Sequence, residues 1–283
     1  MYKVITLNAH LQGGTQFFNG EWNREKNNGK IKWEVSISNT IIDDIISENP
    51  DILILTEFWK FTGYEGFIKE LLSNNYFVEC NTQNREYGKN QILIAFKNNF
   101  QKVEVVDNLD SQFSPDFLHV KVQIENTNLN ILGIRIRQSN FKFSNKYKYR
   151  QKQIEAFHAY CEKLSGPLLI GGDFNHGKIC GDEKLKYSDV QKMYDTLGTS
   201  LLKDTYNFHI LKDLFNQSYK LHTPSGNQFS WYDSVGNGYK LEHFITKNCH
   251  ISNIQYKKGN SYLVDRKGYP APDHKMCIGY LNF

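Results

Sequence analysis

The sequence lacks the features that would assign it to a membrane or secreted class. It has no uninterrupted apolar run of about eighteen residues, which a membrane-spanning helix requires. Its beginning turns polar at Asn8, without the apolar core and small-residue cleavage site of a signal peptide. Five cysteines with no Cys-x-x-Cys pair indicate neither a disulfide framework nor a zinc site. We therefore expect a cytoplasmic protein that does not enter a membrane.

Linkers and repeats are also missing. Only 6 prolines occur in 283 residues, and no Pro-rich or Gly/Ser-rich segment divides the chain. Hydrophobic residues make up 40% of the sequence, which is enough for a sizeable core. We expect residues 1–283 to form a single domain. The lack of an obvious apolar surface stripe favours a monomer without an obligate protein partner.

Basic residues are in only slight excess over acidic ones. There are 34 Lys and Arg against 30 Asp and Glu, a formal net charge of +4. This bias permits a polyanionic partner but does not demand one. Aromatic residues reach 14%, and we interpret them as packing residues rather than as base-stacking groups.

Hydrophobic periodicity predicts a mixture of strands and helices. Helices are expected at residues 33–47, around Phe67 to Leu72, and at 147–164, with short helical stretches in 177–220. The expected strands are residues 3–8, 51–56, 76–80, 91–97, 102–107, 117–125, 128–137, 168–172, 228–232, 240–246, 249–257 and 276–283. Hairpins, such as the one with Asn126-Thr127 at its turn, are too frequent for a doubly wound parallel sheet. The pattern predicts an α+β sandwich of two packed mixed β-sheets flanked by helices.

Acidic and amide side chains recur at the ends of apolar strands, where a rigid scaffold presents functional groups. Together with one histidine, they are Asn8, Glu57, Asp173, Asn175, Asp273 and His274. Each alone is more often a turn residue, but their combination is less easily explained that way. Hard oxygen ligands with few cysteines suit Mg²⁺ or Mn²⁺ rather than zinc.

These segments resemble the endonuclease/exonuclease/phosphatase superfamily, which has the DNase I-like fold. The superfamily includes exonuclease III-type AP endonucleases, neutral sphingomyelinases and inositol-polyphosphate 5-phosphatases. The matching segments are TLN at 6–8, LILTE at 53–57, GGDFN at 171–175, KLEHF at 240–244 and PDH at 272–274. They occur in the family's order over nearly the whole chain, and Tyr149-Arg150-Gln151 is similar to the AP-endonuclease branch. The resemblance implies a four-layer α/β-sandwich.

The resemblance also implies a role for each matching residue. Glu57 corresponds to a metal-ligand glutamate, Asn8 to the asparagine beside that metal, and Asp273 to a possible second metal ligand. Asp173 and Asn175 correspond to the pair that positions the attacking water and a phosphoryl oxygen. His274 corresponds to the histidine that contacts the scissile phosphate. Of Asp173 and His274, we favour Asp173 as the group that activates water.

Three positions depart from the family's pattern. Glu242 stands where the family has an aspartate that orients the histidine, and its extra methylene changes the reach of the carboxylate. Arg135 occupies the place of a histidine or tyrosine. An arginine can donate two hydrogen bonds to a phosphate, but it stays protonated and cannot transfer a proton. Pro272 replaces a serine.

The resemblance therefore implies a Mg²⁺-dependent phosphodiesterase, in particular a nuclease that hydrolyses DNA. The basic and aromatic segment 140–150 is a candidate contact for the DNA backbone, or simply a solvated loop. Two alternatives stay open at this point. One is a phosphoesterase for a small-molecule or lipid phosphate, which the mild net charge favours. The other is a catalytically inactive binding member of the fold, which Glu242 and Arg135 suggest.

Overall fold

The computed structural model describes residues 1–9, 41–58, 64–81, 91–138, 148–175, 208–232, 236, 238–259 and 274–283 with their side chains. It adds the backbone of short elements and helix ends at 17–18, 21–22, 24–27, 30–33, 39–40, 146–147, 203–207, 263–264 and 270–271. Asp273 and most of the segment 140–150 lie outside these ranges.

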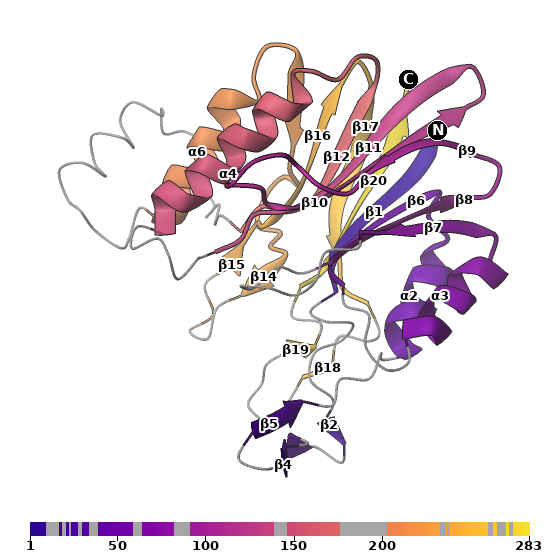
Figure 1. The fold of residues 1–283 in the computed structure, drawn as a ribbon, viewed down its shortest axis with the longest axis vertical. Coiled ribbons are helices and arrows are strands. Elements are labelled where there is room, and N and C mark those ends of the chain that lie inside the picture. The colour runs from indigo at the N-terminus through magenta and orange to yellow at the C-terminus, as the bar shows by residue number, and fades with distance from the viewer. Residues whose placement is uncertain are drawn as a thin grey trace.

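One six-stranded sheet, called sheet I below, contains the first and last long strands (Figure 1). Its order is β17-β20-β1-β6-β8-β7. The strands are β1 (Tyr2–Asn8), β6 (Ile52–Phe58), β7 (Tyr76–Cys80), β8 (Gln91–Lys97), β17 (His250–Lys257) and β20 (Met276–Asn282). β1 is parallel to β6 and antiparallel to β20, so the sheet is mixed. The parallel pair brings the carboxyl ends of β1 and β6 to the same edge.

A second six-stranded sheet, sheet II, has the order β13-β16-β12-β11-β10-β9. Its strands are β9 (Gln101–Val106), β10 (Asp116–Ile124), β11 (Thr127–Arg135), β12 (Leu168–Asp173), β13 (Tyr219–His222) and β16 (Glu242–Lys247). Only the pair β11–β12 is parallel. Sheet II is therefore also mixed, and it presents the carboxyl ends of β11 and β12 together.

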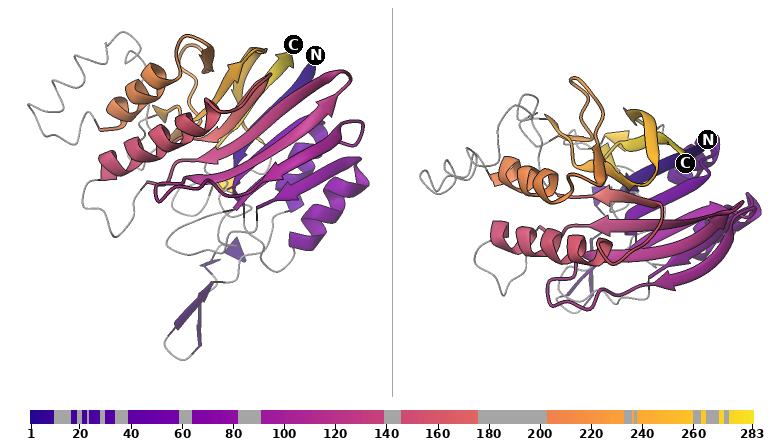
Figure 2. Two further views of the ribbon diagram at one scale, coloured as in Figure 1. Left: turned by 45° about the horizontal axis from the view of Figure 1, so that its top comes forward. Right: turned by 90° about the horizontal axis from the view of Figure 1, so that it is seen from above.

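The two sheets pack face to face, with helices on both outer faces (Figure 2). α2 (Asn39–Glu48) and α3 (Tyr64–Ser73) cover sheet I, whereas α4 (Lys146–Cys161) and α6 (Lys203–Leu214) cover sheet II (Figure 1). Side-chain alternation along the strands builds three apolar layers. In β6, Ile52 and Ile54 join the core between the sheets, while Leu53 and Leu55 pack on the helix side. The α+β sandwich expected from the sequence is confirmed.

Several boundaries differ from the prediction. The predicted helix 33–47 begins only at Asn39, because Trp33 ends the short strand β5 (Lys30–Trp33). The predicted strand 228–232 is reduced to β14 (Trp231–Tyr232), which pairs with β15 (Gly238–Tyr239). The hairpin turn lies one residue earlier than expected, since Ile124 pairs with Thr127 and Glu125 takes a positive φ of 54°. β13 was not predicted, since it is short and partly polar.

The remaining strands form short two-stranded ladders. They are β2 (Phe17–Phe18), β3 (Glu21–Trp22), β4 (Arg24–Asn27), β18 (Leu263–Val264) and β19 (Pro270–Ala271), in addition to β5. Within the described ranges, no helix has both the length and the apolar character needed to cross a bilayer. The four described cysteines, Cys80, Cys161, Cys249 and Cys277, are free thiols.

Gly133 sets how closely the sheets approach at the centre of the sandwich. A Cβ at this position would lie 2.5 Å from Cγ2 of Ile92 and 3.1 Å from Cγ2 of Ile54, both on sheet I. We expect Gly133→Ala to lower the free energy of unfolding by about 1–3 kcal/mol because the core must shift to admit the methyl group. Urea denaturation measures this change.

The matched control is Gly66→Ala in α3, where an added Cβ meets nothing within 4 Å. We expect this variant to be neutral or stabilised by up to about 1 kcal/mol, since alanine is the better helix former. Equal stability of the two variants would contradict close packing at Gly133.

Candidate active site

Four charged residues cross sheet II side by side. Asp116 of β10 pairs with Arg135 of β11, Arg135 with Asp173 of β12, and Asp173 with Glu242 of β16. Asp116 and Glu242 are fully buried, and Asp173 is 1% exposed. Buried charges are costly unless they are paired or hydrogen-bonded. This row therefore needs partners, which sheet I supplies.

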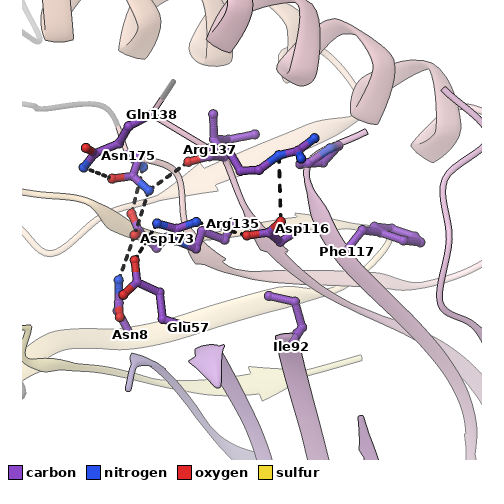
Figure 3. A network of polar contacts seen from close by, with 12 residues as sticks. Asn8, Glu57, Ile92, Asp116, Phe117, Arg135, Arg137, Gln138, Asp173 and Asn175 are labelled. Carbon is purple, nitrogen blue, oxygen red and sulfur yellow. Dashed lines mark hydrogen bonds and ion pairs between the residues drawn. The ribbon is translucent and has the colours of Figure 1, made fainter. Parts of the chain in front are cut away.

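Three contacts between polar side chains join sheet I or its flanking residues to this row (Figure 3 shows the first two). Asn8, at the end of β1, donates from Nδ2 to Oδ2 of Asp173 at 2.9 Å. Glu57 of β6 accepts Nη2 of Arg135 at 2.6 Å. His274, just before β20, contacts Oε1 of Glu242 through Nδ1. Five side chains predicted from strand ends, together with Arg135 and Glu242, thus converge at one edge of the sandwich.

A β-bulge turns Glu57 toward sheet II. Ile52 and Ile54 of β6 face the inter-sheet core, so regular alternation would direct residue 57 to the helix side. The register between β6 and β8 shifts between Leu55 and Phe58, and Glu57 has a φ of 52°. A non-glycine residue in this region is strained, and such strain is typical of functional positions. The bulge lets the Glu57 carboxylate reach Arg135.

Asp173 is held by three hydrogen bonds. Its Oδ1 accepts the backbone N–H of Asn175 at 2.8 Å, and its Oδ2 accepts Nδ2 of Asn8 and Nδ2 of Asn175 at 2.9 and 3.0 Å. Burial raises the pKa of Asp173 to about 7, and the carboxylate of Glu242 adds to the increase. His274 and Arg135 act in the opposite direction. The result is a fixed carboxylate that is a stronger base than an ordinary aspartate.

Asn175 is fixed as firmly as Asp173. Its Nδ2 also donates to the carbonyl of Ile136 at 2.8 Å, and its Oδ1 accepts Nε2 of Gln138 at 2.8 Å. Its φ of 46° lies in the left-handed region, which asparagine tolerates better than most residues. Asn175 therefore orients Asp173 through two of its own N–H groups.

The longer side chain of Glu242 does reach His274. Glu242 is fully buried and His274 is 6% exposed. The second carboxylate oxygen, Oε2, is buried without a hydrogen-bond partner among the described residues. The replacement of the expected aspartate by Glu242 thus keeps the carboxylate–imidazole pair.

Arg135 lies between two carboxylates. Its Nη2 contacts Glu57, and its Nη1 donates to Oδ2 of Asp116 at 3.0 Å. Burial by itself lowers the pKa of Arg135, but Glu57 and Asp116 raise it above its ordinary value. The guanidinium is therefore a permanent cation inside the site, and both of its terminal nitrogens face protein carboxylates.

Sequence reasoning missed Asp116, Arg137 and Gln138. Nε of Arg137 lies 3.8 Å from Oδ1 of Asp116, and its guanidinium sits 5.9 Å from the centre of the Tyr149 ring. A two-residue turn at residues 125–126 places 116 opposite 135, so correct placement of the turn would have revealed the pair Asp116–Arg135.

Comparison with solved structures identifies the architecture. An AP endonuclease from Archaeoglobus fulgidus superimposes with a TM-score of 0.61 at 14% identity, covering 100% of both chains. The chain has the DNase I-like fold. TDP2 from D. rerio, complexed with a single-strand DNA product, gives 0.62 at 9% identity, covering 100% of this chain and 99% of that one.

A third match and two negative results complete the comparison. The mannosyl-6-phosphatase Bt3783 of Bacteroides thetaiotaomicron VPI-5482 gives a TM-score of 0.59 at 13% identity, with 100% of both chains covered. All three structures are members of the endonuclease/exonuclease/phosphatase superfamily. No protein-family model and no curated sequence matches this chain.

Within this DNase I-like fold, the donor atoms suit a hard divalent cation. The carboxylates of Glu57, Asp173 and Glu242 and the amide of Asn8 supply oxygen atoms from neighbouring strands. Asp173, Glu242 and His274 offer ligand atoms within 4.8 Å of one another. The unpartnered Oε2 of Glu242 is a further oxygen that a cation would satisfy. Oxygen-rich sets of this kind bind Mg²⁺ or Mn²⁺.

The contact between Glu242 and His274 can be tested by measuring the free energy of unfolding. We expect His274→Ala to lower the free energy of unfolding by about 3 kcal/mol, because it leaves a buried carboxylate without its partner. The double variant His274→Ala/Glu242→Gln no longer has the unpaired Glu242 carboxylate beside Asp173. It should therefore recover part of the stability that His274→Ala loses. Urea denaturation of the two single variants and the double variant gives the coupling energy. A double variant less stable than His274→Ala would refute the pairing.

Proposed function

We propose that this protein is a Mg²⁺-dependent phosphodiesterase that hydrolyses DNA. The observation that carries the proposal is the convergence of Asn8, Glu57, Asp173, Asn175 and His274 on one buried polar edge between the sheets. The DNase I-like fold supports it, because an AP endonuclease and a TDP2 bound to single-strand DNA product share this architecture. The mild positive charge of the chain is compatible with a polyanionic substrate.

Glu57 and Asn8 would hold the Mg²⁺ or Mn²⁺ ion, and Asp273 is the candidate for a second cation. When bound, the ion neutralises charge that develops on the phosphoryl oxygens. Both Glu57 and Asn8 extend from carboxyl ends of the parallel strands β1 and β6, which fixes their spacing. The side chain of Glu57 is 17% exposed, so it is partly accessible to solvent.

We assign the activation of water to Asp173. Its raised pKa makes the carboxylate a better proton acceptor, and its hydrogen bonds to Asn8 and Asn175 hold it in one orientation. His274 contacts Glu242 through Nδ1, so its Nε2, on the opposite side of the ring, is the atom that we assign to the phosphate. The Glu242 carboxylate beside the ring fixes the orientation of the imidazole, so that Nε2 can donate to a phosphate oxygen.

A small-molecule phosphate ester is the second candidate substrate. A mannosyl-6-phosphatase has the same architecture as this chain, with a TM-score comparable to those of the DNA-processing structures. A net charge of only +4 gives weak long-range attraction for a nucleic acid. The chemistry at Asp173 and His274 would be the same for either substrate.

Removal of the Asp173 charge tests the mechanism. We expect Asp173→Asn to reduce kcat by about 10²- to 10⁴-fold, the usual contribution of a positioned general base. Its stability should fall only modestly, by about 1–2 kcal/mol, because the new amide nitrogen cannot accept the hydrogen bonds from Asn8 or Asn175, whereas repulsion with Glu242 is relieved. The measurement is Mg²⁺-dependent hydrolysis, with Glu155→Gln on the exposed side of α4 as control. A rate close to wild type would remove Asp173 from the reaction.

Two substrates separate the candidate functions. One is an end-labelled duplex with an abasic site, and the other is a chromogenic p-nitrophenyl ester, used both as the phosphodiester and as the phosphomonoester, each with Mg²⁺ and with EDTA. DNA cleavage whose KM rises steeply with salt would support the nuclease, since phosphate contacts release counterions. Turnover of the chromogenic ester without DNA cleavage would favour the small-molecule esterase. No turnover of either substrate would contradict both.

A further inference from the structure

Charges alternate along a buried line at the candidate active site (Figure 3). The line runs from Glu57 of sheet I to Arg135, Asp116 and Arg137 of sheet II. The side chains of Arg135 and Arg137 are only 11% and 6% exposed, and that of Asp116 is fully buried. Solvent therefore screens these interactions poorly.

Arg135 gives the Glu57 carboxylate a cation of its own. Nη2 of Arg135 lies 2.6 Å from Oε1 of Glu57, which is contact distance for a charge-assisted hydrogen bond. The other terminal nitrogen is anchored on Asp116 at 3.0 Å, so the guanidinium is held from both sides. Register fixes this arrangement as well, because Arg135 pairs with Asp116 on one side and Asp173 on the other.

A divalent ion on Glu57 would meet this guanidinium at close range. Two like charges a few ångströms apart repel strongly where water is largely excluded. The ion must therefore displace Nη2 from Oε1 or bind against the full charge of Arg135. Either route weakens binding of the ion.

We propose that Arg135 is a built-in competitor for the divalent metal, which holds Glu57 in the metal-free protein and raises the metal concentration that the site requires. This inference rests on Glu57 being the metal ligand of the proposed function. Arg135 is then a positioning residue that sets metal affinity through Glu57.

Mn²⁺ binding to the full chain tests the proposal without any activity measurement. Titration calorimetry and the electron paramagnetic resonance signal of free Mn²⁺ both give the dissociation constant. We expect Arg135→Gln to tighten Mn²⁺ binding by about tenfold or more, because one nearby positive charge is removed. Unchanged or weaker binding would overturn the proposal.

Arg137→Gln is the matched control. It removes the same charge from the same line of residues, but Arg137 contacts Asp116 and not Glu57. We expect it to tighten binding by less than about threefold, since the remaining effect is long-range. Equal gains in Arg135→Gln and Arg137→Gln would indicate a general effect of charge and would overturn the proposed competition.

The dependence on Glu57 is tested in the background of Glu57→Gln. The gain from Arg135→Gln should disappear there, because the competing carboxylate is already absent. A gain that persists would place the ion elsewhere, for example at Asp173, Glu242 and His274, and would overturn the proposal.

Two further outcomes are informative. Arg135→Gln removes a positive charge next to the buried Asp116, which could destabilise the fold. The comparison is therefore repeated in a background in which Asp116 is neutral, between Asp116→Asn and Arg135→Gln/Asp116→Asn. The same gain in Mn²⁺ affinity is expected there. Equal binding by wild type and Arg135→Gln overturns this inference alone. If no protein in the series binds Mn²⁺, the metal site of the proposed function fails together with it.

Discussion

Three contacts between polar side chains across the sandwich are the constraint on which the site depends. Asn8–Asp173, Glu57–Arg135 and His274–Glu242 each join a residue of sheet I, or one next to it, to a strand of sheet II. Each contact is made by one side chain from each sheet, and these side chains have fixed lengths. The distance between the sheets must therefore be nearly constant at this edge. The core of isoleucines, valines and leucines between the sheets maintains that distance.

Charge balance explains how the site accommodates several buried carboxylates. The row across sheet II holds three carboxylates and Arg135, with Glu57 added from sheet I. Asp173 responds with a raised pKa, Glu242 is paired with His274, and Asp116 and Glu57 share Arg135. The guanidinium of Arg135 is therefore the cation that neutralises Glu57 in this structure.

The sequence predicts the fold and most of the site because both depend on local pattern. Long apolar strands followed by polar residues are recognisable without any tertiary information, and this places Asn8, Glu57 and Asp173 at strand ends. The contacts of Arg135 with Glu57 and Asp116 could not be predicted from local pattern. They depend on a bulge that turns Glu57 and on a hairpin register that one misplaced turn residue obscures. The start of α2 was wrong for a similar reason, since Trp33 belongs to a strand pair that local periodicity does not encode.

Gly172 limits how this site can be altered. Its φ is 153°, and a Cβ there would lie 1.9 Å from the carbonyl oxygen of Ile134 on the neighbouring strand. No other amino acid fits beside that main chain, so the approach of the following residue, Asp173, is fixed by backbone alone. A side chain at Gly172 would push β12 away from β11 and displace Asp173 from Asn8, so this glycine is the residue of the site that tolerates substitution least.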